Sequence, residues 1–259
     1  MRERLSIACP AYNESEGIVA TLTRWVEYLQ DSDIAHSYEI VVCNDGSTDR
    51  TGILVQELSR QYPIIKIIHH PVNRGAAAAM ATAIAHTTGD WVLLLDSDGQ
   101  FPVENLEPMW KCVLQSQADA VIGYRVRKED SAFARLGSRA SNLVCGLIYG
   151  RRLRDFNSAL QLVRGPLLRS LPLEARGLNN STEIASRLLE LQLEGHLTLL
   201  EAPARHLPRH TGRSSRKLFR DSWHRFLFVM YLGVRRFLQK QNVIQPARLH
   251  TQENKISHD

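Results

Sequence analysis

The stretch Trp91-Val-Leu-Leu-Leu-Asp-Ser-Asp-Gly-Gln-Phe-Pro102 places five apolar residues directly before two carboxylates, Asp96 and Asp98, and a turn. An uninterrupted apolar run of this kind is typical of a strand buried on both faces of a parallel sheet. The carboxylates then fall at the carboxyl end of the strand, where open α/β sheets bind their ligands. Two hard oxygen donors there suit a divalent cation, Mg2+ or Mn2+, that bridges phosphates. Taken alone, the same residues also fit a solvated turn.

The rest of the chain alternates strand and helix patterns, which predicts a doubly wound α/β sheet. Strand patterns occupy residues 5–9, 38–43, 64–69, 91–95, 120–123, 158–163 and 197–202. Helical spacing of apolar residues occupies 16–30, 49–62, 75–86, 103–115, 133–149, 182–194 and 222–239.

Composition narrows the class of protein. With 44% hydrophobic and 23% charged residues, the chain has the make-up of an ordinary globular protein. Its four cysteines, Cys9, Cys43, Cys112 and Cys145, show no close spacing, which indicates neither a zinc site nor a disulfide framework and fits a reducing, cytoplasmic setting. The sequence has no apolar leader and no run of about 18 apolar residues, so we expect neither secretion nor a spanning helix.

Positive charge is concentrated near the carboxyl terminus. Residues 205–240 hold ten Lys and Arg against one acid, Asp221, so this segment carries +9 while the whole chain carries +5 and the remainder −4. Basic residues beside the apolar helical face of 222–239 suit adsorption to an anionic membrane surface, and equally a helix packed on the catalytic domain or on another subunit. A nucleic-acid-binding module is a further alternative, but the segment lacks a recognition motif and interleaved stacking aromatics, so we expect no nucleic acid partner.

Three more polar segments follow strands of the predicted sheet. They are Pro10-Ala-Tyr-Asn-Glu14, Asn44-Asp-Gly-Ser-Thr-Asp49 and Asn73-Arg-Gly75. Each segment alone is a weak indication of a ligand site, because an acid in a turn usually caps a helix or stabilises the turn. Together with the Asp96 segment, each after its own strand, they indicate one ligand site at the carboxyl edge of the sheet.

With these segments the chain resembles the family 2 glycosyltransferases of the GT-A type over roughly residues 4 to 215. It is most similar to polyprenol-phosphate sugar synthases of the dolichol-phosphate mannose synthase kind. The motifs that carry the closer likeness are Asp96-Ser-Asp-Gly-Gln-Phe-Pro102, Gly123-Tyr-Arg125, Arg139, Asp155-Phe-Asn-Ser158 and Arg209-x3-Gly-Arg213-Ser214. The resemblance implies a mixed, mostly parallel sheet flanked by helices, with a basic amphipathic helix at the carboxyl end.

The resemblance also implies roles for single residues. Pro10, Ala11, Tyr12 and Glu14 would line the nucleoside pocket of a nucleoside diphosphate sugar, with Asp45 accepting a hydrogen bond from the base and Arg74 near the diphosphate. Asp96, Asp98 and Gln100 would hold the metal and the diphosphate, and Asp98 and Arg125 would take part in catalysis. Arg125, Arg139, Arg213 and Ser214 would hold the acceptor's phosphate, since guanidinium groups bind phosphate well. Many relatives have a basic residue and a second glycine after Asn-Arg-Gly, whereas this chain has Ala76 and Ala77, which favours a packing role there.

The residues alone are compatible with two kinds of sugar acceptor. A polyprenyl phosphate is already ionised near neutral pH, with a second pKa of about 6, and needs arginines rather than a base. A hydroxyl acceptor must lose a proton, and Asp155 and Glu183 are the candidate bases. A donor-binding homologue without turnover is a third alternative. No Gly-x-Gly-x-x-Gly follows the first strand, which disfavours a dinucleotide-dependent oxidoreductase.

The resulting hypothesis is an inverting, metal-dependent glycosyltransferase. Its domains are predicted as a catalytic domain over 1–215, a basic amphipathic helix over 216–240 and a disordered tail over 241–259. GDP-mannose and UDP-glucose both fit as donors, with the former favoured by family likeness alone. We expect a cytoplasmic protein, peripheral on the inner face of the membrane if the helix binds lipid. The oligomeric state is left open.

Overall fold

The computed structural model describes residues 3–126, 142–151, 153–175, 177, 179–208 and 218–241. The described strands form one seven-stranded sheet in the order β3-β2-β1-β4-β6-β5-β7. Their bounds are β1 (Arg4–Ala11), β2 (Ser37–Asn44), β3 (Ile65–His69), β4 (Trp91–Leu94), β5 (Ala120–Arg125), β6 (Gln161–Arg164) and β7 (Leu199–Ala204). The helices are α1 (Ile18–Gln30), α2 (Thr51–Gln61), α3 (Ala76–Ala85), the 3-10 turn η1 (Val103–Asn105), α4 (Leu106–Ser116), α6 (Gly165–Ser170), α7 (Asn180–Leu193) and α8 (Leu218–Lys240). Residues 142–149 are helical as well.

The sheet is mostly parallel. β3, β2, β1 and β4 run in the same direction as neighbours, and β5 pairs with β7 in parallel. Among the described strands, β6 is reversed, since it pairs antiparallel with both β4 and β5. The mixed, mostly parallel α/β sheet expected from the sequence is therefore confirmed.

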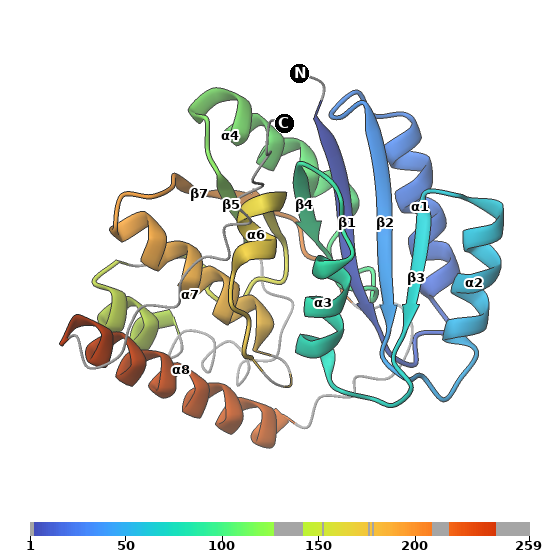
Figure 1. Ribbon diagram of the computed structural model, residues 1–259. Helices are drawn as coiled ribbons and strands as arrows, with labels where there is room; N and C mark the ends of the chain where they lie inside the picture. The colour runs from blue at the N-terminus through green and yellow to red at the C-terminus, as the bar shows by residue number, and fades with distance from the viewer. Residues whose placement is uncertain are drawn as a thin grey trace, which may run out of the picture.

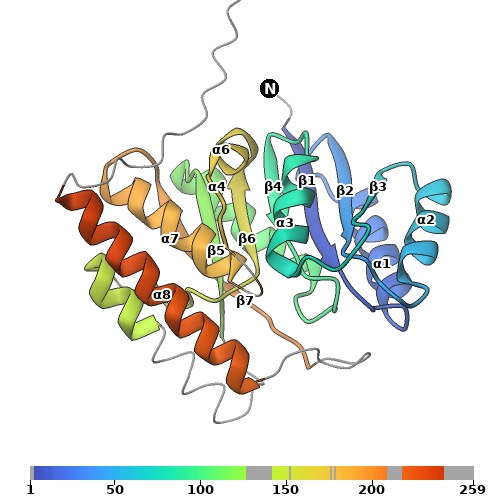
Figure 2. The ribbon, with the colours of Figure 1, turned by 60° about the horizontal axis from the view of Figure 1, so that its bottom comes forward.

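Helices cover both faces of the sheet and make three layers (Figure 1). Residues of α1, α2 and α4 share one buried apolar cluster with one face of the sheet, and residues of α3, α6 and α7 share a second cluster with the other. α8 lies outside α7, beside the helix 142–149, in both ribbon views (Figure 2). The predicted tail beyond residue 241 lies outside the described residues.

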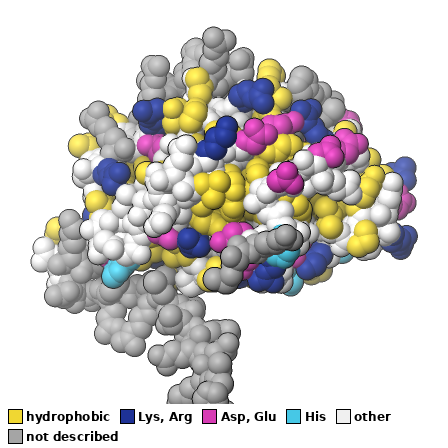
Figure 3. Space-filling model, turned by 90° about the horizontal axis from the view of Figure 1, so that it is seen from above, with side chains coloured by type: hydrophobic (Ala, Val, Ile, Leu, Met, Phe, Trp, Pro, Cys, Tyr) yellow, Lys and Arg dark blue, Asp and Glu magenta, His cyan; other side chains and the backbone are white. Residues whose placement is uncertain are grey.

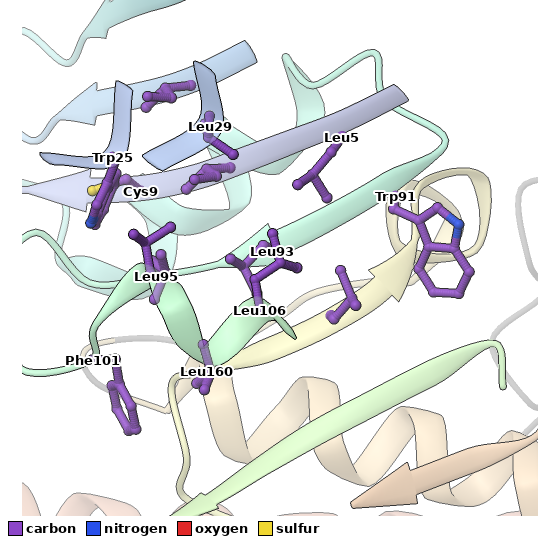
Figure 4. Close-up of a cluster of buried hydrophobic side chains, with 14 of the residues drawn as sticks. Leu5, Cys9, Trp25, Leu29, Trp91, Leu93, Leu95, Phe101, Leu106 and Leu160 are labelled. Carbon is purple, nitrogen blue, oxygen red and sulfur yellow. The ribbon is translucent and has the colours of Figure 1, made fainter. Parts of the chain in front are cut away.

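The central strands are buried on both faces, as their apolar runs predict. In β1, Ile7 and Cys9 belong to the cluster under α1, while Ala8 belongs to the one under α3. Figure 4 shows Leu93, Leu95 and Leu106 side by side where β4 leads toward α4. Five residues of the alanine-rich α3 are buried, which confirms the predicted close packing of its small side chains: Ala77, Ala79, Met80, Ala83 and Ile84.

Two helix starts show how the local sequence sets the boundaries. Asp49 Oδ1 accepts from the backbone N–H of Thr51 at 2.9 Å and from its hydroxyl at 2.5 Å, which fixes the start of α2. The helix predicted over 103–115 is divided into η1 and α4, because the chain leaves Pro102 in an extended conformation and first makes a 3-10 turn.

The amino edge of the sheet, opposite the polar segments, carries acids and bases side by side (Figure 3). Arg4 pairs with Asp90 at 3.2 Å and Arg164 with Asp119 at 3.0 Å. Glu39 forms a third pair at this edge, with Lys66, and it is more buried than Asp90 or Asp119. Its carboxylate accepts from Lys66 at 2.6 Å, from the Ser6 hydroxyl and from the backbone of Thr88.

Glu39 makes the stability of the fold pH-dependent. Burial by itself raises the pKa of this carboxyl, but the hydrogen bonds from Lys66, Ser6 and Thr88 outweigh it and lower the pKa from about 4.5 to about 2. We expect the stabilisation to be complete above the ordinary value and lost as the pH falls from about 4.5 through 2. After allowance for the half-exposed Lys66, the loss is roughly 2 kcal/mol.

Urea unfolding of the wild type and of Glu39→Gln between pH 7 and pH 2.5 measures this effect. The wild type should be the more stable at pH 7, and the difference should shrink as the medium becomes acidic. Glu57→Gln, at an exposed position of α2, serves as the control and should follow the wild type at every pH. A Glu39→Gln difference that does not depend on pH would contradict the assignment.

Candidate active site at the carboxyl edge of the sheet

The loops after β1 and β2 are joined by reciprocal hydrogen bonds. The backbone N–H of Asn13 donates to Ser47 Oγ at 3.0 Å, and Asn13 Oδ1 accepts from the backbone N–H of Thr48 at 2.9 Å. The N–H of Glu14 donates to Thr51 Oγ1 at 2.8 Å. Asn13 has a φ of +54°, a conformation that asparagine adopts more readily than most residues. The first two predicted segments are thus held together as one wall.

Asp45 connects this wall to the third segment. Its Oδ1 accepts from the backbone N–H of Arg74 at 2.9 Å, and its Oδ2 accepts from the backbone N–H of Gly75 at 2.8 Å. The ring Nδ1 of His70 lies 2.7 Å from Oδ1. Both Asp45 and His70 are buried, so the carboxylate is satisfied inside the protein.

The ring of His70 is held from both sides. With its Nδ1 proton directed at Asp45, its Nε2 accepts from the Thr82 hydroxyl, 2.9 Å away on α3. The buried Asp45 carboxylate therefore fixes the turn 73–75 and the start of α3. That Asp45 accepts a hydrogen bond from a nucleobase stays a prediction.

The fourth segment brings Asp96 and Asp98 to the same edge. Both side chains are partly exposed, while the intervening Ser97 is buried. Burial raises the pKa of the Cys9 thiol well above its ordinary value, and the charges of Asp96, Asp98 and Glu14 raise it further. Three negatively charged carboxylates therefore lie near the end of β1, and a bound cation would reduce the repulsion between them.

The donor set fits a hard divalent cation that is also bound by phosphate. Asp96 and Asp98 supply carboxylate oxygens, and Gln100 is partly exposed in the same loop. Within the described part of the chain, no group of three or more His, Cys, Asp and Glu side chains is placed to hold a metal ion by itself. A site completed by ligand phosphates and water is the usual arrangement for Mg2+.

Arg125 and Asp155 form a buried ion pair at the end of β5. Arg125 Nε donates to Asp155 Oδ2 at 2.8 Å, and Arg125 Nη2 donates to Oδ1 at 3.2 Å. The Asp155 side chain is 1% exposed and that of Arg125 is 11% exposed. This two-point geometry orients the guanidinium group and fully engages the carboxylate.

Glu183 is engaged in a similar way at the start of α7. Its oxygens accept from the backbone N–H groups of Glu174 at 2.9 Å and Ala175 at 2.7 Å, and from Arg187 at 3.3 Å. Its side chain is 1% exposed. Both candidate bases therefore hold parts of the protein together.

The remaining predicted residues differ in their exposure. Pro10 and Ala11 are buried at the end of β1, Tyr12 and Glu14 are partly exposed, and Arg74 is exposed. Arg139, Arg213 and Ser214, predicted to hold the acceptor's phosphate, lie outside the described residues.

With this geometry in place, comparison with known proteins identifies the family. The sequence model described as Glycosyl transferase family 2 matches residues 6–175, which is well over half of the chain. The chain belongs to glycosyltransferase family 2.

Curated relatives include enzymes that are named for a polyprenyl phosphate. A dolichyl-phosphate beta-glucosyltransferase of Trichomonas vaginalis is 36% identical over 132 residues, which cover 48% of this chain and 41% of that protein. An undecaprenyl-phosphate 4-deoxy-4-formamido-L-arabinose transferase of Edwardsiella ictaluri is 30% identical over 172 residues, or 64% of this chain and 51% of that protein. The chain thus spans about half the length of the curated relatives it matches.

Solved structures of glycosyltransferases share the fold. Mannosyl-3-phosphoglycerate synthase from Rubrobacter xylanophilus matches with a TM-score of 0.69 at 17% identity, over 95% of this chain and 77% of that one. Glucosyl-3-phosphoglycerate synthase from Mycobacterium tuberculosis, in complex with Mn2+ and UDP-Glc, matches with a TM-score of 0.63 at 20% identity, over 90% and 79%. The GT-A fold expected from the sequence is confirmed.

Sequence reasoning missed three residues that shape this family 2 site. His70 directly follows the strand predicted over 64–69, and no role was predicted for it. Asn13 was placed in the polar segment after the first strand, and Asn105 within the helix predicted over 103–115. The signal for Asn13 was its place just before Glu14 in a turn, where asparagine favours the left-handed conformation. His70 and Asn105 gave no local signal, because their hydrogen-bond partners are distant in sequence.

We expect Asp45→Asn to lower the free energy of unfolding by about 1–3 kcal/mol, because an amide presents a single acceptor oxygen to several buried donors. Urea unfolding monitored by circular dichroism measures the change. Asp33→Asn, at an exposed position before β2, should stay within about 0.5 kcal/mol of the wild type. Equal stability of Asp45→Asn and wild type would show that the carboxylate does not hold the turn.

Proposed function

We propose that this chain transfers a sugar from a nucleoside diphosphate sugar to a polyprenyl phosphate, with a divalent cation at Asp96 and Asp98. The proposal depends above all on one observation: both candidate general bases, Asp155 and Glu183, are buried and engaged by other groups of the protein. A phosphate acceptor needs no base, whereas a hydroxyl acceptor does.

The donor side of the proposal rests on the joined segments at the carboxyl edge. The loops that contain Tyr12, Asp45 and Arg74 are tied together, and the Asp96 loop follows the neighbouring strand β4. Open α/β sheets bind nucleotides at this edge. Membership of family 2 and the shared GT-A fold support the same assignment.

The reaction would be an inverting displacement. A phosphate oxygen of the acceptor forms a bond with the anomeric carbon while the bond from that carbon to the diphosphate oxygen breaks, and the nucleoside diphosphate leaves. A bound cation would neutralise charge on the leaving diphosphate. Asp96, Asp98 and Gln100 would hold that cation and the diphosphate, while Arg125, kept in place by Asp155, would face the acceptor's phosphate.

UDP-glucose and GDP-mannose are the donors to test first. The Trichomonas relative is named as a beta-glucosyltransferase, and the Mycobacterium structure holds UDP-Glc. These two names favour glucose, whereas the likeness to dolichol-phosphate mannose synthases favours mannose.

A polyprenyl acceptor lies in a membrane, and one surface of the molecule suits contact with lipid. α8 packs on the domain through Val229 and Leu232, which are 1% and 0% exposed. On another side of α8, Val234 is 54% and Phe237 62% exposed, beside Leu147 at 74% on the neighbouring helix. The two helices enclose an apolar groove of about 490 Å³. Val234 and Phe237, which belong to the expected apolar face, are thus accessible for contact with another surface.

The placement of α8 agrees with a role at the membrane surface. Figure 1 shows it at the lower end of the molecule, where the arrowheads of β1 and β2 also lie. Arg235 pairs with Glu190 at 2.8 Å and anchors α8 to α7. No helix in the described residues is long and apolar enough to cross a bilayer. We propose that the exposed face meets the hydrocarbon of an anionic leaflet, to which the net positive charge of the sequence 205–240 attracts the protein.

We expect Mn2+ and the correct donor to raise the melting temperature together, because a ligand that binds only the folded protein stabilises it. Asp98→Asn should lose the metal-dependent part of the shift, whereas Asp31→Asn, at an exposed position at the end of α1, should keep it. A thermal-shift panel of nucleoside diphosphate sugars with and without Mn2+ measures this. The donor assignment fails if no donor gives a metal-dependent shift with the wild type.

The acceptor is tested with the donor found in that panel. Release of nucleoside diphosphate should require a polyprenyl phosphate and should not occur with the corresponding polyprenol. Turnover with the alcohol, together with its collapse in Asp155→Asn or Glu183→Gln while donor binding persists, would instead favour the alternative of a hydroxyl acceptor. Donor binding without turnover on either acceptor would favour the third alternative, a homologue that binds the donor but does not transfer the sugar.

The lipid surface is tested by replacing exposed apolar side chains of α8. We expect Val234→Glu combined with Phe237→Glu to reduce sedimentation with vesicles that contain anionic phospholipid at least tenfold, since two apolar side chains that the lipid would bury are exchanged for charges. Ile53→Glu, at an exposed apolar position on α2, is the control and should bind as the wild type does. Equal binding of all three proteins would contradict the assignment of this surface.

A further inference from the structure

The chain that continues beyond β7 lies along the loop that contains Asp96 and Asp98. The backbone N–H of Leu207 donates to the carbonyl of Gln100 at 2.8 Å. Gln100 Nε2 donates back to the carbonyl of Leu207 at 3.4 Å. The ring of Phe101 meets that of His206 edge to face, with centroids 4.9 Å apart. Residues 205–207 therefore form a seam with the loop, which is called the β7 seam below.

Asn105 closes this seam with its side-chain amide. Its Nδ2 donates to the carbonyl of Arg205, and its Oδ1 accepts from the N–H of the same residue, both at 2.9 Å. The side-chain amide thus makes with Arg205 the same two hydrogen bonds that a neighbouring β-strand would make with its backbone. Asn105 is 3% exposed, so both Arg205 backbone groups depend on it where water has little access.

The β7 seam contacts the loop that contains Asp98 and Gln100, two residues proposed to hold the cation. Between Asp98 and Gln100 the chain turns through Gly99, whose φ of +69° only glycine adopts at low cost. Within this turn the N–H of Gln100 donates to Asp98 Oδ1 at 3.1 Å. A glycine turn of this kind is intrinsically pliable, so the orientation of the Asp98 carboxylate depends on what holds Gln100.

Gln100 is held from two directions. The adjacent Phe101 is anchored in the apolar core with Leu95 and Leu160 (Figure 4). On its other side the β7 seam fixes the carbonyl and the side chain of Gln100. Asn105 adds a side chain that binds both backbone groups of one residue across this seam.

We propose that Asn105 is a positioning residue for the cation and diphosphate site. It holds residues 205–207 against the loop, the seam holds Gln100, and Gln100 orients Asp98 toward the cation. The assignment of a cation to Asp98 rests on the proposed function, whereas the coupling of Asn105 to the loop stands on the hydrogen bonds alone. Groups that orient metal ligands typically change metal affinity by 10- to 100-fold when they are removed.

Two variants break the seam at different points. Asn105→Ala removes both bonds to Arg205, and Leu207→Pro removes the N–H that donates to Gln100 while leaving the Asn105 bonds in place. Leu207 is 37% exposed and lies beyond β7, so this second variant keeps the test open if the first one folds poorly. Asp119→Ala is the matched control. It removes two bonds, to the N–H of Thr198 and to Arg164, at the opposite edge of the sheet.

Hydrogen exchange of the ligand-free protein tests the coupling without reference to function. In Asn105→Ala and Leu207→Pro we expect the amide of Gln100 to exchange about tenfold faster than in the wild type, because local opening becomes easier. Asp119→Ala should leave this amide unchanged. Exchange at Gln100 that is unaffected in both seam variants, or equally raised by Asp119→Ala, would overturn the positioning role.

Calorimetry with nucleoside diphosphate and Mn2+ tests the link to the site. We expect the Mn2+ concentration for half-maximal nucleotide binding to rise about tenfold in both seam variants and not in Asp119→Ala. Unchanged Mn2+ dependence together with faster exchange would overturn the effect on the cation site. If the wild type itself binds no nucleotide with Mn2+, the proposed function fails, and with it this effect, while the exchange result still decides whether Asn105 holds the loop.

Discussion

The structure depends on one constraint: strands that are buried on both faces cannot carry unsatisfied polar side chains along their length. Apart from Ser6 and Glu39, which hydrogen-bond to each other, the buried residues of β1, β2 and β4 are apolar until the strands end, and polar side chains follow immediately afterwards. Because these strands are parallel neighbours, the polar ends meet at a single edge. The same requirement that produces a dry core therefore concentrates the chemistry of the protein in one place.

The carboxylates of the candidate site divide into two kinds. Asp45, Asp155 and Glu183 are satisfied inside the protein by backbone N–H groups and basic side chains, and they hold loops in position. Asp96 and Asp98 stay partly exposed, and their charges act on the buried Cys9. Carboxylates with rigid internal partners suit the support of a site, whereas partly exposed ones suit contact with a ligand. This division supports a phosphate acceptor over one that needs a base.

The sequence was sufficient to predict the alternation of elements, the buried strands and the edge where the polar segments gather, because each depends on local periodicity. The reversal of β6 was not visible in the residues themselves, since a strand of four residues, Gln161–Arg164, gives no signal of its direction. The buried side of α8 was not predicted either, because Val234 and Phe237 of the predicted apolar face are exposed, whereas Val229 and Leu232 on another side pack on the domain. The bonds of Asp45 and Asn105 could not be predicted because they join residues brought together only by the complete fold.

The reversed strand β6 has a consequence for how the site is assembled. Since β5 ends at the carboxyl edge and β6 begins there, the connection between them leaves and returns on the same side of the molecule. The polar segments after β1, β2 and β4 belong to connections that cross the sheet from edge to edge, and the lengths of these connections are constrained by that crossing. The β5–β6 connection, with Asp155 near its end, has no such span to cover. Its length is therefore not set by a crossing of the sheet, and a change in that length leaves the three crossing connections as they are.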